Sequence, residues 1–252
     1  RHELLRRGFT RGFTRGFASF SHQISARRKE RKRRRKRGKE GERERERMAE
    51  EEEEVVAGLD EAGCGPAFGP LVAAACVLPT PLPPSLSGLD DSKRLTPSRR
   101  SSLAHSIRAC CLHGVGVVSA SEIDDKGLAW ARRAVFHRAL EAMVEKEGAK
   151  EPDRLVVDGT LFEPWRNVRF QCLPKADATV PCVSAASILA KVARDSAIEE
   201  ECDSDPTLDE RYGLRSNKGY LTPQHIEGLR AHGRCDGHRR SFYVKSAFLT
   251  ER

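Results

Sequence analysis

Two adjacent carboxylates, Asp60 and Glu61, follow the apolar run at residues 55–59. Charge inside a fold is costly unless a counter-charge neutralises it, and two neighbouring acids cannot neutralise each other. A divalent cation with oxygen ligands meets this need. The glycines of Gly63-Cys64-Gly65 come directly afterwards and let backbone N–H groups approach a ligand closely. Carboxylates for a metal beside glycines for a phosphodiester or a sugar indicate a metal-dependent enzyme that acts on nucleic acid.

Asp158 repeats this arrangement, since it follows the apolar residues 155–157 and precedes a glycine. If the two strands are neighbours, both carboxylates lie at one edge of a sheet. Asp177 comes just before a long helical stretch, where the helix dipole favours an acid. Taken alone, each aspartate is also typical of a turn or a helix cap. Together with Asp60 and Glu61 they offer ligands for two hard cations about 3.5–4 Å apart, the arrangement that supports in-line displacement at a phosphodiester.

Three polar segments are candidates for substrate contacts. Ser92 and Lys93 precede a predicted helix cap, where they are either solvated or donors to phosphates that position a duplex without reading its sequence. Tyr220 lies on a loop, and a tyrosine there can stack on a sugar or bond a 2′-hydroxyl. Part of the basic segment 238–242 is expected to be structural, with Phe242 in the core.

The apolar spacing predicts the elements that position these groups. Thr96 and Thr222 each precede a proline, the pattern of a helix N-cap followed by N1. Ser121 is expected to cap a helix that continues through Gly127. Antiparallel strands followed by helix–strand alternation predict a layered α/β domain. In chain order we expect strands at 55–60 and 71–78, a helix at 97–112, a strand at 114–120, a helix at 121–148, strands at 154–157 and 169–172, and helices at 180–202 and 223–232.

The positive charge is concentrated at one end of the chain. Residues 1–47 hold 19 Lys/Arg and 6 Glu, so the chain totals of 45 basic and 37 acidic residues leave 26 and 31 for the rest, a net charge of −5. We expect residues 1–50 to be a disordered charged tail and residues 51–252 to form one folded domain. The tail is an organelle transit segment, a nuclear signal or nucleic-acid tether, or an untranslated leader before Met48. In the acidic body, the following basic side chains are expected to line one face: Lys93, Lys218, Arg239 and Arg240.

The eight cysteines all lie in the body, and none forms a C-x-x-C pair. Buried thiols in a reducing compartment therefore fit better than a disulfide framework. No stretch of the sequence approaches the roughly 18 apolar residues of a membrane span.

Seven sequence segments, taken together and in their order along the chain, are specific for one protein family. They are GLDEAGCGPAFGPLVAAACVL, DSKRLT, SASEID, VVDGT, KADATVPCVSAASILAKVARD, NKGYLTPQH and HRRSF. With these segments the chain resembles ribonuclease HII, the bacterial type 2 ribonuclease H, over residues 54–248. The resemblance implies a ribonuclease H-like fold, a mixed five-stranded sheet flanked by helices with a helical C-terminal part. It also implies an endonuclease that cleaves the RNA strand of RNA–DNA hybrids, including ribonucleotides embedded in duplex DNA, with two Mg²⁺ or Mn²⁺ ions.

The resemblance also assigns residues. The family's catalytic and metal-binding acids fall on Asp60, Glu61, Asp158 and Asp177. Its substrate-binding residues fall on Gly63, Cys64, Gly65, Ser92, Lys93 and Tyr220. Two positions depart from the family pattern, since Cys64 stands where the family usually has Arg, and Ala176 where it usually has Gly. A guanidinium lost from a phosphate would weaken binding by about 1.5–3 kcal/mol. Neither departure removes a metal ligand, so we expect activity.

The alternatives are a binding protein, whose basic tail holds RNA beside a silent body, and ribonuclease HIII. The latter is expected to carry a folded N-terminal substrate-binding domain, which the low-complexity residues 1–47 do not resemble. We further expect a monomer without membrane contact. Its location is expected to be intracellular, either cytoplasmic or, if the tail is a targeting segment, in an organelle or the nucleus.

Overall fold

The structure, a computed structural model, describes residues 54–242. The predicted tail at residues 1–50 lies outside these residues, and its disorder stays a prediction. The described chain is built around one mixed sheet of five strands in the order β3-β2-β1-β4-β5, which confirms the predicted fold class. The strands are β1 (Val56–Ala62), β2 (Leu71–Val77), β3 (Leu112–Val118), β4 (Arg154–Asp158) and β5 (Arg169–Leu173).

The pairing of the strands decides which side chains meet at the edge of the sheet. β1 pairs antiparallel with β2, with Asp60 opposite Ala74, and β2 pairs antiparallel with β3. On its other side β1 runs parallel to β4, with Leu59 opposite Val157, and β4 runs parallel to β5. The strand β1, which continues two residues past Asp60, and the strand β4, which ends at Asp158, are therefore neighbours and run in the same direction. The condition under which the sequence places both carboxylates at one edge of the sheet is met.

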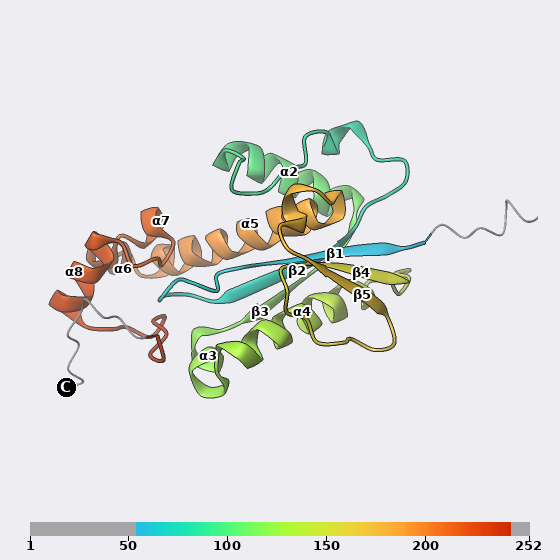
Figure 1. Ribbon diagram of the computed structural model, residues 1–252. Coiled ribbons are helices and arrows are strands. Elements are labelled where there is room, and N and C mark those ends of the chain that lie inside the picture. Colours follow the sequence, from blue (N-terminus) through green and yellow to red (C-terminus); the bar gives the residue numbers. More distant parts are fainter. Residues whose placement is uncertain (1–53, 243–252) are drawn as a thin grey trace, which may run out of the picture. The chain divides into compact units, whose positions relative to one another are not determined.

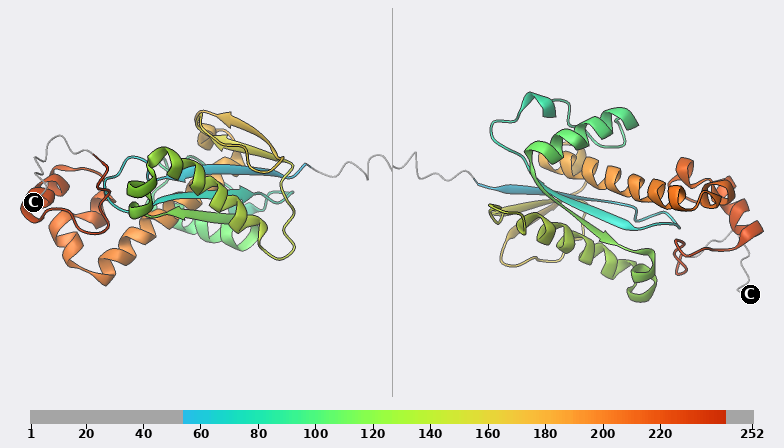
Figure 2. Two further views of the ribbon diagram at one scale, coloured as in Figure 1. Left: turned by 90° about the horizontal axis from the view of Figure 1, so that it is seen from below. Right: turned by 180° about the vertical axis from the view of Figure 1, so that it is seen from behind.

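Helices cover both faces of the sheet (Figure 1). The helices α2 (Pro97–Cys110) and α5 (Pro181–Ser204) pack on one face, and α3 (Ala120–Lys126) and α4 (Leu128–Val144) on the other, as Figure 2 shows from behind. Each layer encloses a core of fully buried side chains, such as Phe136 and Leu140 below the sheet and Leu103 and Leu189 above it. The sheet is thereby held rigidly from both sides.

The helix α5 lies very close to β1. A Cβ atom placed on Gly58 would lie 2.2 Å from the carbonyl carbon of Cys182, so only glycine permits this approach. Alanine and serine residues on the same helix, including Ala185, Ala186 and Ser187, are buried against the sheet. Small side chains thus bring the start of α5 up to the carboxylate end of β1.

The prediction of a single helix at residues 121–148 is wrong in its start and its continuity. The expected helix at 121–148 is two helices, because Gly127 adopts φ +83° and ends α3 before α4 begins. The cap is Ser119 and not Ser121, since the Ser119 side chain accepts from the N–H of Glu122 and the Glu122 carboxylate accepts from the N–H of Ser119. This capping box holds the start of α3. The caps at Thr96 and Thr222 are confirmed.

The C-terminal part is helical, as expected, but contains two short helices that the sequence pattern does not reveal. They are α6 (Thr207–Tyr212) and α7 (Leu214–Asn217), which precede α8 (Pro223–His232) at the far end of α5 (Figure 1). Two 3₁₀ turns complete the structure, η1 (Pro84–Leu86) and η2 (Ala176–Ala178). The eight cysteines all lie within the described residues and are free thiols, and Cys110 is the exposed one. Within residues 54–242 no helix is long and apolar enough to span a membrane.

Candidate functional site

Three aspartates from distant parts of the sequence converge at one edge of the sheet. Asp60 is in β1, Asp158 ends the neighbouring parallel strand β4, and Asp177 lies in η2, just before α5. Each offers a carboxylate oxygen, and these oxygens all lie within 4.8 Å of one another. We call these three residues the acidic cluster. Such an arrangement of oxygen donors suits a hard divalent cation.

Hydrogen bonds from the surrounding chain orient the acidic cluster. The N–H of Ala176 donates to Asp158 Oδ1 at 2.8 Å, and the N–H of Glu61 donates to Asp60 Oδ1 at 2.7 Å. Ala176 is fully buried, and the positive φ of 61° is at the preceding residue, Lys175. The methyl group of Ala176, one of the two departures from the family pattern, is therefore accommodated without displacing the carboxylate of Asp158.

The electrostatics of the acidic cluster favour the binding of a cation. Burial raises the pKa of Asp60 to about 7, helped by the charges of Glu61 and Asp158 and opposed by a hydrogen bond from Ser187. Only 4% of Asp60 and of Asp177 is exposed. Like charges this close disfavour joint ionisation unless a cation binds between them. The donor set and its unfavourable charge therefore fit a divalent metal site.

Glu61, the fourth predicted ligand, is not part of this convergent group. Its Oε1 instead accepts from Arg132 Nη2 at 3.2 Å and lies 3.4 Å from the Cys64 thiol sulfur. Arg132 belongs to α4, on the opposite side of the sheet from α5. Glu61 therefore borders the acidic cluster with its carboxylate engaged elsewhere.

The predicted substrate contacts share a cavity of about 300 Å³ with Asp60 and Glu61. Ser92 is buried, with its hydroxyl 2.9 Å from that of Ser187, while the exposed Lys93 reaches Asp177 Oδ2 at 3.2 Å. Tyr220 is half exposed at the rim opposite Gly65. The predicted residues lining this cavity are Asp60, Glu61, Gly63, Cys64, Gly65, Ser92, Lys93 and Tyr220.

Lys93 is the cation that reaches the acidic cluster from outside. Burial alone would lower the pKa of the Lys93 ammonium, but the hydrogen bond to Asp177 and the charges of Asp177 and Asp91 outweigh it and raise that pKa. A permanently charged lysine at the mouth of the cavity is well placed to meet an anionic substrate.

Two buried arginines, Arg194 and Arg239, support the loop that carries Gly63, Cys64 and Gly65, and we call them the arginine pair. Arg194 donates to the carbonyl oxygens of Phe68, Pro70 and Lys218, and Arg239 donates to those of Cys64 and Gly69. Both are 1% exposed. The expectation that Arg239 lines an outer face is therefore wrong. Its burial is instead the structural role expected for part of segment 238–242.

A buried histidine pair fixes the loop that presents Tyr220. His225 Nδ1 lies 3.0 Å from the carbonyl oxygen of Tyr220, and His225 Nε2 lies 3.0 Å from His238 Nε2. Burial, with the nearby His225, lowers the pKa of His238 to about 4, so the pair is neutral at physiological pH. His238 and Arg239 belong to segment 238–242, part of which is expected to be structural, but no local pattern marks His225 or Arg194. Arg194 contacts residues more than 120 positions away in the chain.

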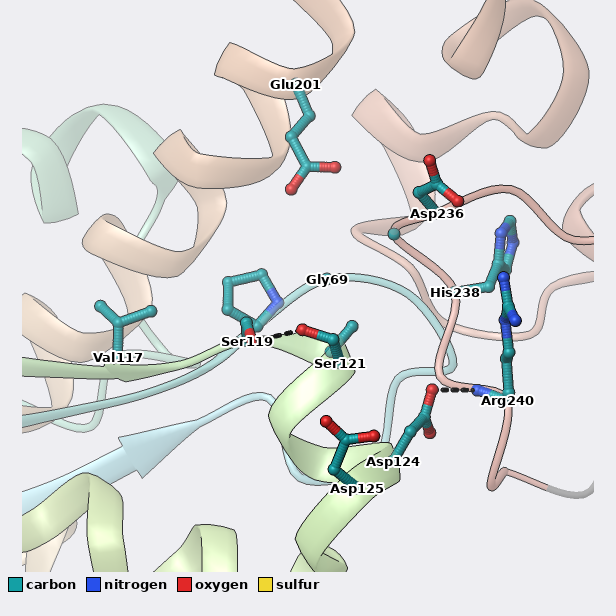
Figure 3. A pocket seen from close by; sticks show the side chains of 13 residues that line it. Gly69, Val117, Ser119, Ser121, Asp124, Asp125, Glu201, Asp236, His238 and Arg240 are labelled. Atoms are coloured by element: carbon teal, nitrogen blue, oxygen red, sulfur yellow. Dashed lines mark hydrogen bonds between the residues drawn. The ribbon is translucent and has the colours of Figure 1, made fainter.

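A larger cavity of about 790 Å³ lies beside His238, and its lining includes none of the acidic cluster (Figure 3). Its lining includes four carboxylates, Asp124, Asp125, Glu201 and Asp236. Asp124 accepts from the backbone N–H groups of Arg240 and Ser241 at 2.8 Å each and therefore ties α3 to the C-terminal segment. None of the predicted catalytic or substrate-binding residues lines this cavity, and the role that the structure shows for Asp124 is this structural contact.

Comparisons with known proteins agree with this geometry. A family model described as Ribonuclease HII matches residues 57–250. A protein named Ribonuclease HII from Erythrobacter litoralis (strain HTCC2594) is 43% identical over 196 residues, which cover 76% of this chain and 89% of the relative.

Two solved structures are also similar. A chain in the PCNA:RNase HII complex from Archaeoglobus fulgidus has a TM-score of 0.60 and 27% identity, and the match covers 76% of this chain and 96% of that one. A mutant protein of Bst-RNase HIII has a TM-score of 0.55 and 25% identity, over 71% of this chain and 63% of that one. Ribonucleases HII and HIII share the fold, and the family model that matches is that of HII. The chain therefore belongs to the ribonuclease HII family and is a nuclease.

Proposed function

We propose that this protein cleaves the RNA strand of RNA–DNA hybrids, including ribonucleotides embedded in duplex DNA, and leaves 3′-hydroxyl and 5′-phosphate ends. The observation that supports this most strongly is the convergence of the carboxylates of Asp60, Asp158 and Asp177 within 4.8 Å. Membership of the ribonuclease HII family supports the same reaction class.

The acidic cluster and Glu61 would hold two divalent ions, Mg²⁺ or Mn²⁺, which supply activation of the attacking water and stabilisation of the leaving oxygen. The chain's own residues do the positioning. Ala176 keeps the Asp158 carboxylate turned towards the cluster, and Lys93 presents a cation to the phosphodiester at the cavity mouth. Ser92 and Ser187 form the buried polar wall behind Asp60.

Recognition of the ribose rests on the opposite wall of the cavity. The N–H groups of the Gly63-Cys64-Gly65 loop and the hydroxyl of Tyr220 would bind the 2′-hydroxyl at the cleavage position. Because a Cβ on Gly65 would lie 3.6 Å from the Tyr220 ring, the two groups are close enough to contact one sugar together. The loop is held from beneath by the arginine pair, so sensing does not depend on the side chain of Cys64.

A labelled RNA–DNA hybrid incubated with the full chain and Mg²⁺ or Mn²⁺ tests the proposal directly. We expect cleavage by the wild type and a fall of about a thousandfold or more for Asp60→Asn, whose amide cannot replace a carboxylate ligand. The melting temperature of this variant should be unchanged or raised. A wild type that binds the hybrid without cleaving it would support the alternative of an RNA-binding protein.

Tyr220→Phe tests ribose sensing separately. Without the hydroxyl, cleavage at a lone ribonucleotide in DNA should fall by about tenfold, while cleavage of long hybrids should fall less, because many contacts position the longer RNA. Measuring kcat/KM on both substrates separates the effects. Equal losses on the two substrates would argue against a sugar contact.

We also propose that the protein acts as a monomer inside the cell without membrane contact. The nature of residues 1–50, and with it the compartment, is a proposal that N-terminal sequencing of the native protein tests. A native chain that starts near Met48 would exclude the targeting role.

A further inference from the structure

Arg132 lies near the start of α4 and reaches the acidic end of β1. Its Nη2 is 3.2 Å from Glu61 Oε1, with 30% of the arginine side chain and 15% of the glutamate side chain exposed. Arg132 is the fifth residue of α4. The fold thus places this guanidinium against a carboxylate of the neighbouring layer, in β1.

The guanidinium of Arg132 is only partly satisfied by this contact. Its Nε is buried and has no hydrogen-bond partner among residues 54–242. An arginine has five N–H donors, and a buried donor without an acceptor is uncommon in folded proteins. Glu61 Oε1, by contrast, contacts both Arg132 and the Cys64 thiol. In this ion pair the acceptor, Glu61 Oε1, is shared between two donors, whereas Arg132 still has an N–H group without an acceptor.

Arg132 and a divalent ion would compete for Glu61. The carboxylate of Glu61 is outside the group of oxygens that converge within 4.8 Å, and the ion pair with Arg132 engages it instead. A cation bound at the acidic cluster attracts Glu61 and weakens its attraction to Arg132, since one carboxylate charge is then shared between two cations. Arg132 lines a separate cavity of about 550 Å³, and its guanidinium, 3.2 Å from Glu61 in the wall of the substrate cavity, is then left without its acid.

We propose that Arg132 holds Glu61 in the free protein and, once divalent ions recruit Glu61, donates to a phosphate of the bound nucleic acid. Arginine suits this exchange, because its planar donors match carboxylate and phosphate equally well. The inference rests on the proposed nuclease function. It adds Arg132 to that function as a positioning residue for Glu61 and a phosphate-binding residue for the substrate.

The hold of Arg132 on Glu61 is tested by Mn²⁺ binding to the full chain without substrate, measured by calorimetry. Arg132→Gln removes the competing cation and should bind Mn²⁺ about two- to fivefold more tightly than the wild type. The matched control is Arg133→Gln, because Arg133 pairs with Glu163 at 3.7 Å and not with Glu61, and it should bind Mn²⁺ as the wild type does. Equal or weaker Mn²⁺ binding by Arg132→Gln would overturn the proposal.

The contact of Arg132 with a substrate phosphate is tested by kinetics on a labelled hybrid at saturating Mn²⁺. Arg132→Gln should raise KM by about tenfold with little change in kcat, because a charge-assisted contact to the substrate is lost. The dependence of log KM on log salt concentration should lose about one unit of slope, the signature of one phosphate contact. Arg133→Gln should keep both values, and Arg132→Lys, which retains the charge, should keep the salt slope.

Thermal melting of each variant provides the folding control. A folded Arg132→Gln protein with the KM and salt slope of the wild type would overturn the phosphate contact. If instead the wild type cleaves no hybrid, the proposed function fails, and the Mn²⁺ comparison of the two arginine variants still decides whether Arg132 holds Glu61.

Discussion

The acidic cluster and the arginine pair both bury side chains of like charge, but they are satisfied in opposite ways. Backbone carbonyl oxygens surround Arg194 and Arg239, with Phe68, Pro70 and Lys218 all accepting from Arg194. The acidic cluster receives few donors, and the pKa of Asp60 is raised to about 7, mainly by burial. Backbone carbonyl groups of the chain itself satisfy most of the arginine pair, with Arg239 Nη2 its one buried donor without a partner among residues 54–242, whereas the acidic cluster needs a bound cation.

This difference separates stability from function. Removing a residue whose partners have no substitute leaves buried carbonyl groups unpaired and destabilises the fold. Removing a charge that repels its neighbours relieves the fold and removes the function. Variants of the arginine pair should therefore unfold more easily, whereas variants of the acidic cluster should fold well and fail to cleave.

The largest expected effect is on catalysis. Asp158→Asn keeps an oxygen that accepts from the Ala176 N–H but removes a carboxylate ligand, so the fold is retained. We expect kcat to fall by about a thousandfold or more. Single-turnover cleavage and a melting curve on the same sample provide the two measurements. A variant that melts well below the wild type would place Asp158 with the structural residues instead.

Arg194→Met should give the largest loss of stability. The change leaves three backbone carbonyl groups without their donor in a buried position, and we expect a loss of about 3 kcal/mol or more. Denaturant unfolding with the matched surface variant Arg230→Met measures it. If Arg194→Met unfolds at the wild-type denaturant concentration, the carbonyl contacts do not stabilise the loop.

The pH dependence of stability without metal should reveal Asp60. Its pKa is about 7 in the folded protein and about 3.8 when unfolded, so the folded state retains the proton longer. Asp60 therefore contributes its full stabilisation of the folded state below about pH 4. This stabilisation, at most about 4 kcal/mol, is lost as the pH rises towards 7 and beyond. Asp60→Asn should abolish this loss. Melting curves at several pH values in chelator compare the two proteins, and identical profiles would contradict the assignment.

The smallest expected effect is that of Lys93→Ala on stability. The Lys93 side chain is 73% exposed, so solvent screens its ion pair with the buried Asp177. Exposed pairs contribute about 0.2–1 kcal/mol, so the unfolding free energy should change by less than about 1 kcal/mol. Denaturant unfolding measures the change. A larger loss would mean that Lys93, and not a divalent ion, is the main counter-charge of the acidic cluster.

The sequence predicted the part of the site that local patterns encode. Asp60 and Asp158 each follow an apolar strand, and parallel pairing of these strands brings the aspartates together. Thr96 and Thr222 mark their helix starts correctly because an N-cap depends on neighbouring residues only. The break at Gly127 was missed, since helix-forming residues on both sides concealed the effect of a positive φ.

What the sequence could not show are the contacts between distant segments. The ion pair of Arg132 with Glu61 joins residues 71 positions apart, and Arg194 contacts Phe68 across 126 positions. Nothing in the local spacing distinguishes these arginines from solvated ones such as Arg133. Tertiary packing alone decides which basic side chains enter the interior.

A titration of the metal-free full chain with Mn²⁺, followed by calorimetry, tests the central claim most directly. The claim is that the carboxylates of Asp60, Asp158 and Asp177 form one divalent cation site. We predict saturable binding by the wild type and affinity weakened by about tenfold or more in each single Asn variant, since each removes a charged ligand. Wild-type affinity in any two of the three variants would contradict it.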